Sequence, residues 1–171
     1  MLVKISVRNL IEFVMRSGDV DNRFRDNTRM IEGIRAHQAI QKKYGKNYKK
    51  EYSLKNITLI EDVEFRVEGR ADGLISEENG FVIDEIKSTT RALSEIDDSN
   101  KLHWAQAMCY AYFYALDNKL KSMSITLTYV NIDDYSTKIF RDKFSFEELK
   151  DFYYKLLEEY LSFSKILAIN N

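Results

Sequence analysis

The sequence has few of the residues that form cross-links or rigid turns. It contains one cysteine, Cys109, no proline and six glycines among 171 residues. One cysteine excludes an internal disulfide, and it excludes the cysteine sets that hold structural zinc or an iron–sulphur cluster. Any metal must therefore be bound through oxygen and nitrogen. The absence of proline fits a chain of helices and paired strands with short turns.

Long apolar runs and an excess of one charge are also missing. No apolar run approaches the roughly 20 residues that span a bilayer, and the first ten residues lack the pattern of a signal peptide. We therefore expect a cytoplasmic protein with no membrane partner. The 26 Lys and Arg residues against 27 Asp and Glu give a net charge of −1, so composition predicts no global attraction to nucleic acid. The length and the apolar fraction of 44% predict one folded domain over residues 1–171.

Hydrophobic periodicity predicts two helices in the first 45 residues. Ser6 can cap the first helix, which is expected to end at Ser17-Gly18. Asn27 or Thr28 can cap the second, in which apolar residues alternate with charges.

The period then changes to that of strands. Residues 48–89 predict three strands, of which the last two form a hairpin through a turn at residues 77–80. A helix, two strands and a final helix follow, over about 98–116, 122–131, 137–144 and 146–168. The order ααβββαββα predicts an α/β domain with a mixed sheet flanked by helices.

Two charged side chains end the strand of residues 81–87. Both faces of this strand begin apolar, which is typical of a central strand. Glu85 and Lys87 share one face because side chains alternate along a strand. A charge at the end of a buried strand is costly unless it has a partner, so these two residues need a structural or chemical role.

The hairpin register brings a second acid to Glu85. Counting back from the turn, Ser76 lies opposite Phe81 and Asp72 lies opposite Glu85. Facing carboxylates repel unless a divalent cation or a lysine compensates them. Such a pair beside Lys87 suits metal-assisted hydrolysis of a phosphodiester bond.

A structural interpretation of the same residues stays open. Lys87 could form a buried ion pair with Asp72 or Glu85 and have no catalytic role. The acid-x-Lys pattern alone is weak, because it recurs at Asp117-x-Lys119 and Glu148-x-Lys150. Only the copy at residues 85–87 ends an apolar strand.

Four segments between about residues 30 and 115 follow one another in a specific order. They are His37 on the second helix, Gly69-Arg70-Ala71-Asp72-Gly73, Ile83-Asp84-Glu85-Ile86-Lys87-Ser88, and Gln106-x-x-x-Tyr110 on the next helix. This set resembles the PD-(D/E)XK nuclease superfamily, and within it the RecB-type branch that contains a histidine. The resemblance implies a restriction-endonuclease-like α/β core and metal-dependent cleavage of DNA.

The resemblance also implies roles for the matching residues. It implies a site for Mg²⁺ or Mn²⁺ formed by His37, Asp72, Glu85 and the carbonyl of Ile86. It implies that Lys87 is catalytic together with the two carboxylates, and that the DNA is contacted by Gln106 and Tyr110. The proline of the family name is absent, and the cysteines of iron–sulphur members are missing.

A second resemblance concerns the start of the chain. Ile5-Ser6-Val7-Arg8-Asn9-Leu10 and Arg16-Ser17-Gly18-Asp19 are similar to the N-terminal nuclease-like domain of some bacterial DinG/XPD-like helicases. This would make the 171 residues an excised domain of a longer chain with a helicase domain, since no Gly-x-x-x-x-Gly-Lys loop is present. Alternative functions are a nuclease-fold module that binds single-stranded or branched DNA without cutting it, and a protein-interaction domain.

Other polar residues have both a functional and a structural interpretation. Glu32 is a second candidate ligand on the helix of His37, and His103 is a candidate phosphate contact. Five lysines interleave with Tyr44 and Tyr48 and could bind phosphates and stack on a base, or they could form a solvated helix end. They are Lys42, Lys43, Lys46, Lys49 and Lys50.

Overall fold

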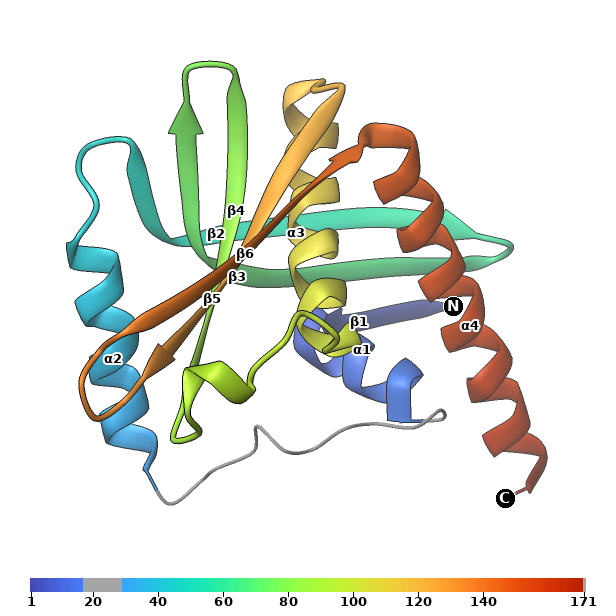
Figure 1. Cartoon of the computed structure of the whole chain (residues 1–171). Coiled ribbons are helices and arrows are strands. Elements are labelled where there is room, and N and C mark those ends of the chain that lie inside the picture. The colour runs from blue at the N-terminus through green and yellow to red at the C-terminus, as the bar shows by residue number, and fades with distance from the viewer. Residues whose placement is uncertain (17–28, 171) are drawn as a thin grey trace.

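The computed structural model describes residues 1–16 and 29–170. In chain order the elements are β1 (Leu2–Ser6), α1 (Val7–Arg16), α2 (Met30–Lys42), β2 (Tyr48–Ile60), β3 (Val63–Glu77), β4 (Gly80–Thr89), the short 3-10 helix η1 (Leu93–Glu95), α3 (Lys101–Asn118), β5 (Ser122–Asn131), β6 (Thr137–Ser145) and α4 (Phe146–Asn170) (Figure 1). No helix within the described residues is long and apolar enough to cross a membrane.

One mixed sheet forms the centre of the fold. Its strands lie in the order β1-β3-β4-β5-β6, and β2 pairs with the remaining edge of β3. The β1–β3 and β4–β5 pairs are parallel, and the other three pairs are antiparallel. The predicted α/β class with a mixed sheet and flanking helices is confirmed, and the predicted central position of β4 is correct.

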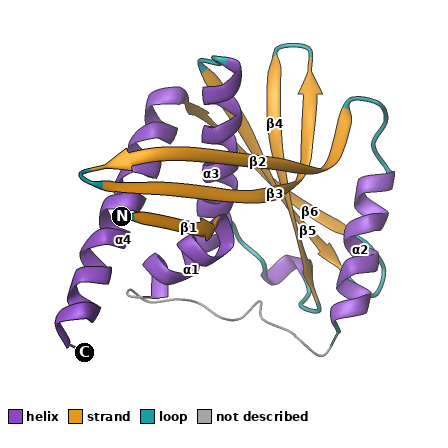
Figure 2. Cartoon of the chain, turned by 180° about the vertical axis from the view of Figure 1, so that it is seen from behind, coloured by secondary structure: helices purple, strands orange, loops and turns teal. Residues whose placement is uncertain are grey.

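Helices cover both faces of the sheet. The main core joins α1, α3 and α4 to the sheet and includes the fully buried Phe65, Phe113, Tyr129 and Tyr153. A smaller core places Ala36 and Ile40 of α2 against β4 and β5. Two views of the chain show α2 on the side away from α1, α3 and α4 (Figures 1 and 2).

The predicted element order lacked the first strand. Residues Leu2–Ser6 form β1, which pairs in parallel with residues 64–68 of β3. A strand of five residues whose partner lies some 60 positions later has no local hairpin signal, so the chain pattern did not reveal it. The predicted cap is correct, because the Asn9 N–H donates to Ser6 Oγ at 3.1 Å. The predicted cap at Asn27 or Thr28 and the end at Ser17-Gly18 lie outside the described residues.

The edge of β3 that faces β4 contains an opening. The hairpin has the predicted Ser76–Phe81 pairing, but its ladder ends at Gly73–Asp84, one position before Asp72 and Glu85. On the same edge, the β1 ladder ends at Glu68. Residues 69–72 therefore pair with neither β1 nor β4 on this edge. We call this unpaired part of the β3 edge the opening, and the candidate site lies there.

Candidate active site

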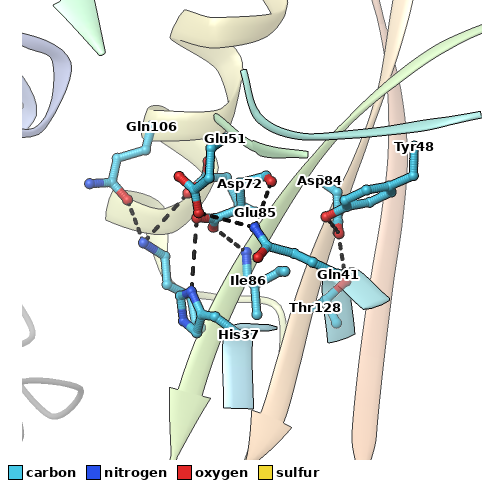
Figure 3. Close-up of polar contacts among 11 residues, drawn as sticks. His37, Gln41, Tyr48, Glu51, Asp72, Asp84, Glu85, Ile86, Gln106 and Thr128 are labelled. Carbon is cyan, nitrogen blue, oxygen red and sulfur yellow. Dashed lines mark hydrogen bonds and ion pairs between the residues drawn. The ribbon is translucent and has the colours of Figure 1, made fainter. Parts of the chain in front are cut away.

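The two predicted carboxylates meet where β3 and β4 separate. The backbone N–H of Ile86 donates to Asp72 Oδ2 at 2.7 Å, and the backbone N–H of Asp72 donates to the Glu85 carboxylate. Side chains thus replace the ladder bonds that the separating strands no longer make. Asp72 and Glu85 are neighbours as predicted, although they are not a backbone pair (Figure 3).

Lys87 lies between this acid pair and α3. Its Nζ is 2.7 Å from Gln106 Oε1 and 3.6 Å from Glu85 Oε2. Of the two ion pairs that the structural interpretation allowed, the contact with Glu85 is present, and Gln106 fixes the ammonium group beside this carboxylate. The other glutamate oxygen, Glu85 Oε1, is buried and has no hydrogen-bond partner in the described part of the chain.

Helix α2 reaches the same acids from the other face. His37 Nδ1 is 3.9 Å from Asp72 Oδ1. One turn later, Gln41 Nε2 donates to the Asp72 carbonyl oxygen at 2.9 Å and to Glu51 Oε1 at 3.1 Å. The i, i+4 spacing of His37 and Gln41 is a signal that could have identified Gln41 from the sequence.

The surroundings make the acids resist ionisation and keep the histidine neutral. Burial raises the pKa of Asp72, and Lys87 and the Ile86 N–H offset this only in part. Burial and then the charge of Asp72 raise the pKa of Glu85. Burial and then Lys87 lower the pKa of His37 to about 4. A neutral imidazole has a free lone pair, as a metal ligand requires.

Tyr110 lies at the opening on the side of α1. A Cβ built on Gly69 would be 2.7 Å from the Tyr110 hydroxyl oxygen, so the absent side chain leaves room for the phenol. Burial and then the charge of Glu85 raise the pKa of Tyr110. The structure therefore gathers His37, Asp72, Glu85, Ile86, Lys87, Gln106 and Tyr110 around one opening.

Asp84 is a further buried acid at this site, and its role was not predicted from the sequence. Asp84 is fully buried and accepts hydrogen bonds from Thr126 and Thr128 at 2.8 and 2.7 Å, and from the Tyr48 hydroxyl at 3.0 Å (Figure 3). Tyr48 crosses the hairpin at Gly73, where a Cβ would come within 2.1 Å of its ring. A sequence pattern cannot pair Asp84 with hydroxyls that lie 36, 42 and 44 positions away.

Glu51 is the other acid that the sequence analysis missed. It breaks the β2–β3 ladder with φ of 52°, a left-handed conformation that is rare for residues other than glycine. Its negative charge adds to the effect of burial on the raised pKa of Asp72, and it opposes part of the lowering of the His37 pKa. Residual strain of this kind often accompanies functional sites, but no local sequence signal marks it here.

The remaining polar candidates have structural partners. Glu32 pairs with Arg29, which also contacts Asp133 at 2.8 Å. The buried His103 has Nδ1 2.9 Å from the Tyr129 hydroxyl. The Tyr48 hydroxyl donates to Asp84 and its ring stacks on Tyr44, so the ring packs inside the protein and does not need a base to stack on. These contacts explain Glu32, His103, Tyr44 and Tyr48 without a ligand.

The donor set at the opening has the chemistry of a site for a hard divalent cation. Mg²⁺ and Mn²⁺ prefer carboxylate oxygens, and Mn²⁺ also accepts imidazole. The partnerless Glu85 Oε1 beside Asp72 supports such an ion. Over residues 1–16 and 29–170, no three His, Cys, Asp or Glu side chains gather closely enough to enclose a metal. The carboxylate pair is thus the part of the site that is already in place, and His37 lies next to it.

Solved structures of other proteins are similar to this chain. A solved structure designated SSO0001 is similar with a TM-score of 0.59 at 15% identity, over 91% of this chain and 75% of the other. An alkaline exonuclease from Laribacter hongkongensis gives a TM-score of 0.46 at 13% identity, over 98% and 95% of the two chains. Its complex with dAMP gives 0.44 at 13% identity, over the same shares. No curated protein sequence matches the chain.

The fold is that of the restriction-endonuclease-like α/β proteins. The model of the PD-(D/E)XK nuclease superfamily matches residues 14–167, and the chain belongs to this superfamily.

Proposed function

We propose that this protein is a divalent-metal-dependent nuclease that hydrolyses phosphodiester bonds in DNA. The observation that carries the proposal is the buried pair of Asp72 and Glu85, with one free carboxylate oxygen, beside a lysine that Gln106 holds in place. Membership of the nuclease superfamily supports the same activity.

The proposed metal is Mg²⁺ or Mn²⁺. Asp72 and Glu85 would hold it, with His37 and the Ile86 carbonyl as further ligands. Such an ion lowers the pKa of a bound water and stabilises charge on a phosphate oxygen. The bound ion would also stabilise the two ionised carboxylates, because a cation relieves the repulsion between them.

The protein's own residues supply the rest of the chemistry. The ammonium of Lys87, held between Gln106 and Glu85, would stabilise the negative charge that develops on the scissile phosphate. Gln106 keeps this cation in position, and Tyr110 would contact the DNA beside it. The neutral His37 cannot repel the cation.

The wider context is proposed from the sequence resemblances. We infer a RecB-type nuclease domain that contains a histidine, spans residues 1–171 and acts on single-stranded or branched DNA. A helicase domain in the same full-length chain fits the similarity of its first 20 residues to DinG/XPD-like helicases.

A second candidate is a nuclease-fold module that binds DNA without cutting it. The Lys87–Glu85 contact of 3.6 Å favours it, because a structural ion pair has the same geometry. The Glu85 oxygen without a partner argues against the non-cutting module, because a purely structural ion pair would leave no buried acceptor unsatisfied.

A cleavage assay separates the two candidates. Single-stranded and branched oligonucleotides are incubated with wild type and Lys87→Ala in Mg²⁺, Mn²⁺ or chelator, and binding is measured in parallel. We expect Lys87→Ala to lose about 100-fold or more in cleavage rate, with affinity nearly unchanged. The matched control is Lys165→Ala, because Lys165 is exposed on α4 and pairs with Glu61. Equal rates for Lys87→Ala and wild type would remove the lysine from the mechanism.

A further inference from the structure

A groove leads away from the candidate site on the side of α1. It has a volume of about 520 Å³ and is lined by Ser6, Ser53, Leu54, Lys55, Glu68, Gly69 and Arg70. These residues come from the end of β1 and from the paired strands β2 and β3. Residues 69 and 70 belong to the unpaired part of the β3 edge, and Asp72 follows only two residues after Arg70.

A largely buried phenol lies at the end of this groove that is nearer to Asp72. Tyr110 is 6% exposed, and its hydroxyl lies against the lining residue Gly69. The hydroxyl therefore lies beside the lining strand, three residues before Asp72, where it can contact a ligand bound in the groove.

An unpaired cation lies on the same side of the site. Arg8, on the first turn of α1, is exposed and forms no ion pair with any residue that the structure describes. It follows the groove-lining residue Ser6 by two positions, so it lies on the side of the groove where β1 ends. Its charge also offsets a small part of the raised pKa of Asp72 and Tyr110. A free arginine on this side of the groove is suited to bind a phosphate.

The groove itself has the donors that a nucleic-acid backbone needs. Lys55 and Arg70 are cations against the single acid Glu68, and the two serines offer neutral hydroxyl donors. Hydroxyls and basic side chains are the usual partners of phosphate and sugar oxygens. At about 3.3 Å per residue, Arg70 is roughly 7 Å from Asp72 along β3, which is within the reach of a neighbouring nucleotide.

We propose that this groove, with Arg8 and Tyr110 at its entrance, binds the phosphate backbone of a single DNA strand adjacent to the scissile bond. The inference rests on the proposed function, because it needs the scissile phosphate at the two carboxylates. It adds a strand path and assigns a phosphate contact to Arg8.

Two pairs of matched variants test the path. Arg8→Gln removes the free cation, and its control Arg66→Gln removes an exposed β3 arginine that pairs with Glu64 at 2.7 Å. Ser53→Glu places a carboxylate in the groove, and its control Ile57→Glu changes an exposed residue four positions further along the same strand. Each control alters the net charge as its partner does.

Affinity for a fluorescein-labelled single-stranded oligonucleotide is measured by anisotropy, with chelator present and over a range of salt. We expect Arg8→Gln to weaken binding about fivefold to tenfold and to reduce the salt slope by about 0.7. Ser53→Glu should weaken binding by at least as much, and both controls should stay within about twofold of wild type. In cleavage assays the two groove variants should raise KM more than they lower kcat.

The outcomes separate this inference from the proposed function. If wild type cleaves DNA and the groove variants bind as their controls do, the groove is not the strand path. If wild type neither binds nor cleaves DNA, both the proposed function and this inference are wrong. Reduced affinity for both groove variants alone supports the inference even when no cleavage is seen.

Discussion

Replacing Glu85 with glutamine tests the candidate site through the stability of the metal-free protein. Glu85 is 4% exposed, and its Oε1 has no partner among the described residues. Burial, and then the charge of Asp72, raise its pKa more than Lys87 lowers it. The ionised carboxylate therefore reduces the free energy of unfolding, and its neutral amide isostere should increase it.

The size of the effect follows from the burial. Full burial can raise a carboxyl pKa by up to about 3–5 pH units, at about 1.4 kcal/mol for each unit. Because Lys87 offsets part of this penalty, we expect Glu85→Gln to gain about 2–4 kcal/mol at pH 8. In a chain of this length, that gain raises Tm by about 5–15 °C.

The pH dependence of the free energy of unfolding independently checks the sign of the stability difference between Glu85→Gln and wild type. The folded pKa of Glu85 lies above its unfolded value, so the wild type loses stability as the pH rises from the unfolded pKa to the folded pKa. The difference between Glu85→Gln and wild type should vanish near pH 4, where the glutamate is protonated in both states. It should grow with pH and become constant above the folded pKa.

Thermal melts followed by circular dichroism, in chelator between pH 4 and 9, measure this difference. The control is Glu77→Gln, because Arg141 lowers the pKa of Glu77 and the variant should not gain stability as the pH rises. Added Mn²⁺ should stabilise the wild type by about 2.7 kcal/mol at a hundredfold excess over Kd, and Glu85→Gln by much less. A Glu85→Gln protein that melts below the wild type at pH 8 in chelator would refute the reasoning.

Three further substitutions test other parts of the site. His37→Ala should weaken Mn²⁺ more than Mg²⁺, because imidazole is the better ligand for manganese; titration calorimetry with each ion measures this, and equal losses would exclude the ligand role. Gln106→Ala should lower kcat about tenfold or more, because the Lys87 ammonium loses its acceptor and its position; unchanged single-turnover rates would contradict this. Gly73→Ala should cost about 1–3 kcal/mol, because the new Cβ would lie 2.1 Å from the Tyr48 ring; a denaturant midpoint equal to that of the wild type would show that the ring moves freely.

Short-range patterns predicted most of the fold. Alternation and turn residues predicted the hairpin at residues 77–80, and from it the Ser76–Phe81 register. Helical periodicity predicted α3 and α4 to within a few residues. These features depend on neighbours in sequence, so the local pattern contains them. β1 was missed because its only partner strand is distant in sequence.

The same distinction applies to the site. Asp72, Glu85 and Lys87 could be brought together from one hairpin, and the structure places them together. The partners of Asp84 come from β2 and β5, and the positive φ of Glu51 arises where β2 breaks its ladder. These two acids depend on packing between distant segments, which no pattern within one segment encodes.

The pairing of β1 also determines the order in which the site can form during folding. The β3–β4 hairpin closes over a few residues, so it can bring the two carboxylates together early. Leu2 must pair with Glu64 across about 60 intervening residues, and closing such a long loop costs more entropy and time. We therefore expect the acid pair to form before Arg8 and the groove residue Ser6 reach their positions. On the ribosome, β1 has to wait for β3 to emerge, so the two carboxylates come together before the proposed strand path is complete.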